Sequence, residues 1–260
     1  EQQRIVSILD EVFKEVDNEI TQAEQKLHNG KELFRSAVEE FFKQEGGDWE
    51  EPTLLELLER GWITSHLDGN HGGEYPRKSE FIDEGIRYIS ANCIRNQTVD
   101  LTNSKFLSPE RAARLRKGIA QDRDVLFAHN ATVGPVAILR TNESKIILGT
   151  SLTYYRCNLD YIIPEYLAHY MRSYRFTIQY SKIMRQSTRN QVPITKQREF
   201  THLIPPKDVQ YEMAKKFDAL QTEITELEKR YQQELRNYKE LTQSILQEAF
   251  NGNLTMEITA

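Results

Sequence analysis

The chain has 260 residues, which is enough for one ordinary domain with long helices or for two modest domains. With 38% hydrophobic and 28% charged residues, and no apolar run approaching ~18 residues, the composition excludes a membrane span and a secretory signal and predicts a cytoplasmic protein. The two cysteines, Cys93 and Cys157, are too few for a disulfide framework and too distant in sequence for a metal knuckle, which fits a reducing compartment.

The net charge of −5 is unevenly distributed along the chain. Residues 1–70 carry a charge of −10, residues 71–208 carry +8 and residues 209–260 carry −3. Because nucleic-acid phosphates attract Lys and Arg, only the middle segment is expected to face DNA.

The two ends of the chain are copies of one segment. Residues 1–44 align with residues 209–252 without a gap, and twelve aligned positions are identical, including the run Lys31-Glu32-Leu33 against Lys239-Glu240-Leu241. An unbroken register with a shared tripeptide indicates an internal repeat rather than chance similarity between charged helices.

Each copy carries apolar residues at alternating spacings of three and four, the pattern of helices that pack along a seam. The stripe consists of Ile5, Leu9, Val12, Val16, Ala23, Leu27, Phe34, Ala37 and Phe41 in the first copy, and of Phe217, Leu220, Ile224, Leu227, Tyr231, Tyr238, Leu241 and Ile245 in the second. At 1.5 Å per residue each helix would be roughly 65 Å long.

If the ends of the middle segment lie close together, the two helices must run antiparallel, and two copies of one sequence then create a pseudo-twofold axis. Such symmetry in a DNA-binding protein usually mirrors two half-sites, and ~65 Å is about two turns of duplex at ~34 Å per turn. The pair would then act as a ruler. A generic antiparallel coiled coil used for dimerisation explains the stripe equally well.

The middle segment, residues 46–208, mixes helices and strands. Helices are predicted at residues 53–60, stopped by Gly61; from Ser108 to near Gly118; and from near Pro164, carrying Leu167, Tyr170, Met171 and Tyr174. Strands are predicted at residues 124–128, 133–140 and 146–156, with a turn at Asn142-Glu143. The predicted class is α+β: a globular domain with a mixed or antiparallel sheet, plus a long antiparallel two-helix coiled coil formed by the terminal segments.

The strongest local signal for DNA lies between Glu165 and Glu199, where there is no acidic residue. This stretch contains Arg172, Arg175, Lys182, Arg185, Arg189, Lys196 and Arg198. The amides of Gln186, Asn190 and Gln191 could read adenine edges, while Arg185 and Arg189 could read guanine or hold phosphates. A solvated basic helix face is the alternative. Tyr174, Phe176 and Tyr180 are predicted to be core residues rather than base-stacking groups.

Several short motifs occur in the order found in the specificity subunits of type I restriction-modification systems, and together they cover nearly the whole chain. They are EQQRIVSILD at the start, DGNHGGEYP (68–76), GIRYIS (85–90), FLSPE (106–110), DVLFAHNATVGPV (124–136), PEYL (164–167), VPIT (192–195), LIPP (203–206) and EAFNGNL (248–254). The chain resembles this family, in which target-recognition domains alternate with repeated helices.

The chain departs from the family pattern in two ways. A full member has two recognition domains, whereas this chain has one, so it resembles the second half of a subunit with its central helix, or a half-size form that pairs with itself. The Glu1-Gln2 pair, typical of the family, is Val209-Gln210 in the second copy. Because the chain starts at Glu1 without a Met, we expect missing upstream sequence, and whether it includes a first recognition domain stays open.

The resemblance implies a division of labour. The predicted domains are a first helix (1–45), a target-recognition domain (46–208) and a second helix with a tail (209–260). The recognition domain would read half of a bipartite target in double-stranded DNA, while the helices set the spacing and dock adenine methyltransferase subunits; the nuclease-translocase subunit would join through that complex. Self-association or a second recognition domain would complete the assembly, and S-adenosylmethionine, Mg and ATP are expected only in partner subunits.

The resemblance also suggests loops that contact the DNA grooves, in addition to residues 185–191. These candidates are Asn70, His71, Arg77, Lys78, His129, Asn130, Ala131 and Thr132. A His beside glycines is more often simply a turn residue.

Enzymatic alternatives have weaker support. The only Pro-Pro, in Ile204-Pro205-Pro206-Lys207, lacks the amide and the aromatic of an adenine methyltransferase motif, and no phosphate-binding glycine loop is present. Asp124 with Glu143 and Lys145 imitates the two-carboxylate-plus-lysine layout of a metal-dependent nuclease. His66 and His71 could be paired as metal ligands, but no third ligand is evident. A non-catalytic DNA-recognition subunit is therefore predicted, and the main alternative is a coiled-coil adaptor whose middle domain binds protein.

Overall fold

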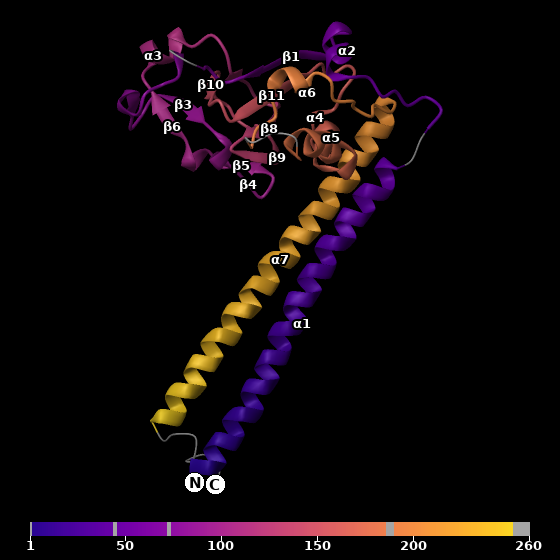
Figure 1. Ribbon diagram of the computed structural model, residues 1–260. Helices are drawn as coiled ribbons and strands as arrows, with labels where there is room; N and C mark the ends of the chain where they lie inside the picture. Colours follow the sequence, from indigo (N-terminus) through magenta and orange to yellow (C-terminus); the bar gives the residue numbers. More distant parts are fainter. Residues whose placement is uncertain (1, 44–45, 72–73, 186–189, 252–260) are drawn as a thin grey trace. The chain divides into compact units, whose positions relative to one another are not determined.

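A computed structural model describes residues 2–43, 46–71, 74–185 and 190–251 of the chain (Figure 1). The chain divides into two compact units: Val38–Phe217, and Glu1–Ala37 together with Asp218–Ala260. Within the described ranges, no helix has the length and apolar character needed to cross a membrane.

The terminal segments form two long helices, α1 (Gln2–Phe42) and α7 (Lys207–Phe250), which lie side by side and run in opposite directions (Figure 1). Lys31 Nζ lies 3.1 Å from Glu228 Oε1 across the pair. The Leu227 side chain comes so close to Gly30 that a Cβ at Gly30 would lie 3.3 Å from it. The antiparallel pairing predicted from the repeat is confirmed.

The predicted seam is wrong at one position. Leu241 is 47% exposed, because near the end of α7 the seam passes through the half-buried Thr242 instead. In α1 the predicted seam residue Phe34 is half-buried and its neighbour Leu33 is 71% exposed, as the stripe requires; the side chain of Ile5 lies outside the described residues.

The unit Val38–Phe217 contains two mixed sheets. The first has the strand order β1 (Ile63–Asp68), β11 (Leu152–Cys157), β8 (Val125–Asn130), β9 (Thr132–Ile138), β5 (Thr98–Val99) and β4 (Ile94–Arg95). The second has the order β2 (Phe81–Ile82), β6 (Lys105–Leu107), β3 (Ile86–Ile89), β10 (Ile146–Leu148) and β7 (Ile119–Ala120). Parallel pairs, β5 with β9 and β3 with β10, make both sheets mixed. The predicted α+β class is confirmed.

Five short α-helices lie in the described part of this unit. They are α2 (Leu54–Glu59), α3 (Pro109–Arg114), α4 (Pro164–Arg172), α5 (Tyr174–Arg185) and α6 (Ile194–Gln197). Thr53 caps α2 and Ser108 caps α3 through their side chains. The cap at Ser108 is the one that the sequence predicts.

Strand β8 is buried on both faces. Because residues of a strand point alternately to opposite sides, its neighbours in sequence pack against different layers. Leu126 and Ala128 belong to the core cluster that joins the two sheets. The ring of Phe127 points the other way and packs on Phe176 and Tyr180 of α5, at centroid distances of 5.8 and 5.6 Å. The core positions predicted for Phe176 and Tyr180 are therefore confirmed.

Three local predictions fail. The predicted strand 146–156 is two strands in different sheets, because Gly149 lies against the backbone of Gly69 and donates its amide to Ile89 O at 2.7 Å. Helix α3 ends at Arg114 because Leu115 turns extended and is buried. The helix from Pro164 ends before Ser173, and Tyr174, predicted to be core, is 59% exposed.

His66 in β1, His129 in β8 and His202 after α6 are buried histidines of this unit. His66 Nε2 is 3.1 Å from Gln197 Oε1, His202 Nδ1 is 3.0 Å from Phe200 O and His129 Nδ1 is 2.9 Å from Val192 O. Their other ring nitrogens have no hydrogen-bond partner within the described ranges. Burial lowers the pKa of His66 to about 4 and that of His202 to about 3.

These pKa values predict acid sensitivity. The unfolded chain takes up protons at both histidines near the ordinary histidine pKa of 6.5, whereas the folded chain does not until about pH 4. Stability is therefore highest above pH ~7 and should fall by several kcal/mol between about pH 6.5 and 4.5, since one pKa unit corresponds to ~1.4 kcal/mol. Urea unfolding across this range measures the slope. His202→Phe should reduce this slope, and His28→Gln, at an exposed position, should not. Equal slopes for the unmodified chain and both variants would show that the buried histidines do not cause the acid sensitivity.

Candidate nucleic-acid interface

The turn between β8 and β9 and the segment after α5, two regions predicted separately from the sequence, lie next to each other. Val192 N donates to His129 O at 2.8 Å, and Ala131 N donates to Asn190 O at 2.9 Å. The Asn190 side-chain amide donates back to Ala131 O, and Asn130 forms a bridge with Gln191. The structure therefore brings two of the candidate regions onto one surface.

The exposed atoms of this turn come from small and polar residues. Ala131 has a φ of 63°, which turns the chain sharply between the strands. Ala131, Thr132 and Asn190 are exposed, whereas His129 is only 1% exposed. His129 is therefore corrected from a groove contact to a supporting residue whose ring holds Val192.

The loop after β1 approaches the same turn. His71 is half exposed, and its Nε2 lies 2.5 Å from Asp68 Oδ2. Burial is the main cause that lowers the pKa of His129, with smaller effects from Asp68, which raises it, and from His71, which lowers it. Strand β1 pairs antiparallel with β11, and β11 pairs antiparallel with β8, so β1 and β8 end at the same edge of the sheet. His71 can present a ring to a ligand, and Asp68 fixes its orientation.

Asn70, in contrast, is 4% exposed and serves the fold. Its Nδ2 donates to Lys117 O at 2.7 Å, and its Oδ1 accepts from Lys117 N at 3.3 Å. A buried amide that satisfies another loop's backbone cannot also read a base, so its predicted groove contact is corrected to a structural role.

Arg77 and Lys78 are exposed near α3. Arg77 N donates to Glu80 Oε2 at 2.6 Å, and Glu80 also lies 2.5 Å from Arg111 Nε. The backbone here is held, while both cationic side chains remain at the surface.

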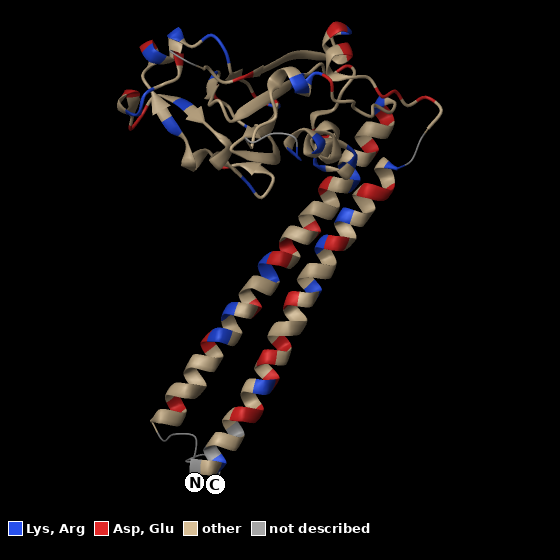
Figure 2. Cartoon of the chain, viewed as in Figure 1, with Lys and Arg blue, Asp and Glu red and all other residues tan. Residues whose placement is uncertain are grey.

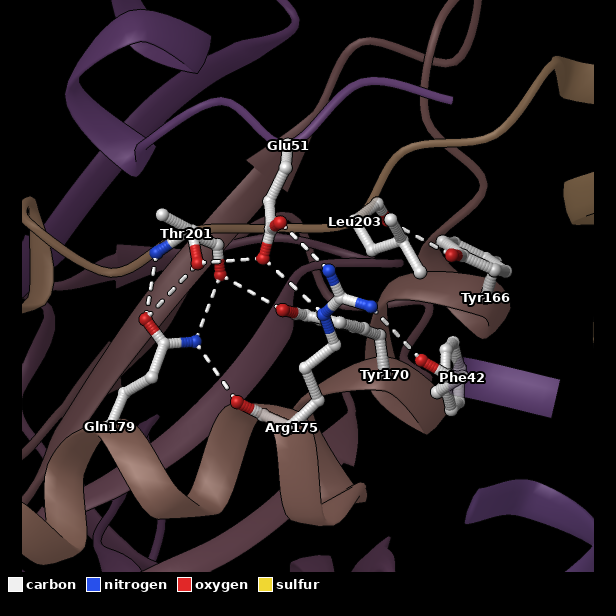
Figure 3. Close-up of polar contacts among 8 residues, drawn as sticks. All are labelled: Phe42, Glu51, Tyr166, Tyr170, Arg175, Gln179, Thr201 and Leu203. Atoms are coloured by element: carbon white, nitrogen blue, oxygen red, sulfur yellow. Dashed lines mark hydrogen bonds and ion pairs between the residues drawn. The ribbon is translucent and has the colours of Figure 1, made fainter. Parts of the chain in front are cut away.

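Arg175, predicted to contact DNA, lies at the centre of a polar cluster inside the unit (Figure 3). Its Nη2 lies 2.7 Å from Glu51 Oε2, and its Nη1 donates to Phe42 O at 3.1 Å. The Gln179 amide and Thr201 complete the network, with Thr201 N donating to Gln179 Oε1 at 2.8 Å. Arg175 is therefore corrected to a structural residue that ties the end of α1 to α5.

Arg172 is also largely occupied. Its guanidinium donates to Val136 O at 3.1 Å and to Gln97 O at 3.2 Å, which joins α4 to β9 and to the turn between β4 and β5. Lys182 and Arg185, farther along α5, are exposed and form no ion pair with any residue the structure describes. Gln186 and Arg189 lie outside the described residues.

Many other basic residues of the domain are neutralised by carboxylates. The pairs are Arg87 with Glu143, Arg111 with Glu80, Arg156 with Asp124, Lys196 with Glu199, and both Arg123 and Arg140 with Glu165. These pairs also separate the residues of the nuclease alternative, because Asp124 and Glu143 belong to different ion pairs and Lys145 Nζ donates to Ala112 O at 2.9 Å. His66 and His71 have separate partners, and the described ranges contain no cluster suited to a metal ion.

The sequence reasoning missed one group of exposed cations. They are Arg114, the last residue of α3, and Arg116 and Lys117, which follow it; Figure 2 shows Lys and Arg concentrated along the loop after this helix. The signal was available, because residues 111–121 contain four basic and no acidic side chains. It was overlooked in favour of the longer stretch at 166–198, part of which is structural.

Comparison with known proteins places this architecture. Residues 48–237 match the family model for the type I restriction modification DNA specificity domain. The type I restriction enzyme EcoBI specificity subunit of Escherichia coli is 25% identical over 179 residues, which is 68% of this chain and 37% of that protein.

Solved structures share the fold. A chain from a study of complex assembly and conformational transition of the type I R-M system matches with a TM-score of 0.78 at 18% identity, covering 97% of this chain and 59% of that one. The HsdS subunit from Thermoanaerobacter tengcongensis matches with a TM-score of 0.62 at 19% identity, over 97% of this chain and 58% of that one. The chain thus spans little more than half the length of these relatives. Because the family model covers most of its residues, the chain belongs to the family of type I restriction modification DNA specificity domains.

Proposed function

We propose that the chain is a non-catalytic, cytoplasmic subunit that recognises one half of a bipartite DNA target. The observation that carries the proposal is the paired surface of the β8–β9 turn and residues 190–191, with the exposed His71 beside it. Polar side chains on two backbone-linked segments can read base edges, while the unpaired cations around them hold phosphates.

Salt-dependent binding tests this function. Fluorescence anisotropy of the chain on genomic DNA fragments should give an affinity that falls steeply as salt rises, because phosphate contacts release counterions. Adenine methylation mapped in cells with and without the gene should then differ at one bipartite sequence. Salt-independent binding with unchanged methylation would favour the alternative of a protein-binding adaptor.

The helices would dock two identical methyltransferase subunits. Of the twelve positions identical between the copies, nine are exposed in both helices. They are Asp10/Asp218, Glu15/Glu223, Gln25/Gln233, Asn29/Asn237, Lys31/Lys239, Glu32/Glu240, Leu33/Leu241, Ser36/Ser244 and Glu40/Glu248. The seam tolerates exchange among apolar residues, so identity on the solvent side supports a shared binding surface.

Six of these pairs, from Gln25/Gln233 to Glu40/Glu248 without Lys31/Lys239, follow helical spacing and share one face of each helix. We call this set the repeated face. The side chains also match in conformation, since Gln25 Nε2 donates to Asn29 Oδ1 at 2.8 Å and Gln233 Nε2 donates to Asn237 Oδ1 at 2.8 Å.

Leu33 and Leu241 give the sharpest test of the repeated face. Each is a large exposed apolar side chain that costs little stability to change. Leu33→Glu should therefore weaken binding of one methyltransferase subunit, and Leu241→Glu that of the other, by about 10-fold or more. Mass measurement of the assembled complex counts the subunits. Arg35→Gln is the control, because Gln243 already occupies the equivalent position; two bound subunits in both leucine variants would contradict the assignment.

A second recognition domain, from a longer chain or from a second copy, would complete the target. Phe42 is 2% exposed, whereas its repeat counterpart Phe250 is 89% exposed. Likewise Ala214 is 4% exposed and its counterpart Val6 is 56% exposed. Positions that are buried within the unit Val38–Phe217 are thus exposed in the other copy of the repeat. This difference supports a second, equivalent binding site for a recognition domain. The nuclease-translocase subunit and the cofactors S-adenosylmethionine, Mg and ATP belong to the partner subunits in this proposal.

A further inference from the structure

The loop that follows α3 is fixed by backbone contacts rather than by flexible side chains. Gly118 has a φ of 63°, and a Cβ there would lie 2.8 Å from Gly69 Cα and 2.9 Å from Asp68 O. A Cβ on Gly69 would in turn lie 2.4 Å from the carbonyl carbon of Gly149. Three loops therefore meet backbone to backbone, a packing that only glycine permits. We call this contact the glycine junction.

Hydrogen bonds hold the junction to strands β10 and β3 of the second sheet. Leu148 N donates to Gly118 O at 2.7 Å, and Gly149 N donates to Ile89 O at 2.7 Å. On the other side of the loop, the buried Asn70 amide binds both backbone groups of Lys117. The backbone at residues 117–118 is consequently held by hydrogen bonds on both sides.

The end of α3 and this rigid loop carry cations that no carboxylate of the described residues neutralises. Arg114, Arg116 and Lys117 are exposed, and none forms an ion pair with the described part of the chain. Between them Leu115 is 1% exposed and anchors the segment in a core cluster of the second sheet. Many other arginines of the domain are paired with carboxylates, whereas Arg114, Arg116 and Lys117 are available to bind an external anion.

The junction also connects these cations to the surface formed by the β8–β9 turn and residues 190–191, which we call the reading surface. Lys117 is held by Asn70, and the residue after Asn70, His71, is exposed and follows β1 at the sheet edge where β8 also ends. A duplex that rests on the turn would therefore extend its sugar-phosphate backbone towards the loop after α3.

We propose that Arg114, Arg116 and Lys117 form a phosphate clamp that positions the DNA duplex on the recognition domain without reading its sequence. The clamp rests on the proposed DNA-recognition function, and it names the residues that would orient the duplex. Its ligand is the DNA backbone, recognised by charge, and its geometry is set in advance by the glycine junction. Preorganisation of this kind lowers the entropy lost when contacts form.

The test compares two triple variants with the same loss of charge. In the intact methyltransferase complex, Arg114→Gln with Arg116→Gln and Lys117→Gln should weaken binding roughly 100-fold and reduce the slope of log affinity against log salt by about 2.7, as expected for three lost phosphate contacts. The matched control is Lys207→Gln with Lys215→Gln and Lys216→Gln, which should change the slope by less than one. Thermal unfolding of both variants verifies that each is folded.

The methylated sequence separates the clamp from the reading surface. The clamp variant should methylate the same target at a lower rate, because its contacts are to phosphates. A clamp variant with an unchanged salt slope, or with an altered target sequence, would overturn the clamp while leaving DNA recognition intact. Absence of salt-dependent binding by the unmodified complex would instead refute the proposed function itself.

Discussion

Replacing Phe42 with alanine is expected to lower the free energy of unfolding by about 3–5 kcal/mol, the range for a large aromatic side chain removed from a packed core. Phe42 is 2% exposed, and its ring contacts Tyr166, Tyr170 and Phe217 at centroid distances of 5.9, 5.4 and 5.9 Å. The cavity would open where the end of α1 meets α4 and the start of α7. Urea denaturation followed by circular dichroism measures the loss.

The internal repeat supplies the matched control. Phe250→Ala changes the same residue type at the equivalent position of the second helix, where the ring is 89% exposed, and should alter stability by less than about 0.5 kcal/mol. Equal losses in the two variants would show that Phe42 is not packed as the structure places it.

Gln197→Met is expected to cost roughly 3–5 kcal/mol, since each buried donor left without a partner costs about 1–3 kcal/mol. Gln197 is fully buried, and its Oε1 accepts from Thr153 Oγ1 at 2.9 Å and from Tyr155 OH at 3.2 Å, with His66 Nε2 at 3.1 Å. Methionine has a similar length and volume, so the loss would report missing hydrogen bonds rather than a cavity. Urea denaturation gives the stability.

The same substitution should loosen the reading surface. Gln197 Nε2 donates to Val192 O at 3.2 Å, the carbonyl that also accepts from His129. Amide hydrogen exchange at Val192 and Ala131 should therefore accelerate more than exchange at β10. Gln243→Met, on an exposed face of α7, is the control; if exchange near the turn stays unchanged in Gln197→Met, Gln197 does not position that segment.

The long-range repeat and the local periodicities were readable from the sequence because they depend on residues close in the chain or aligned by a fixed offset. The antiparallel helices, β8, β9 and the capped helices α2 and α3 all follow from such patterns. The boundary between β10 and β11 did not, because it is imposed by the approach of Gly149 to Gly69, eighty residues away. Local propensity cannot report a contact of that kind.

The charge of a residue was easier to predict than its use. Arg175 and Lys182 belong to the same basic stretch, yet Arg175 is neutralised by Glu51, more than a hundred residues earlier, and Lys182 remains exposed. Likewise Asn70 and His71 are adjacent, and only the fold reveals that one is buried against Lys117 and the other faces solvent. The partner of a side chain depends on tertiary structure. The sequence alone could therefore name candidate residues, but it could not separate the structural ones from the exposed ones.

Strand β8 carries the β8–β9 turn at its end, and it is clamped between two layers: Ala128 faces the second sheet and Phe127 faces α5. Close packing transmits a change of volume in either layer to the strand as a small displacement. Substitutions deep in the interior would thus shift the groups that we propose face the bases. If this surface recognises DNA, its target sequence would then depend partly on interior residues that do not contact the double helix.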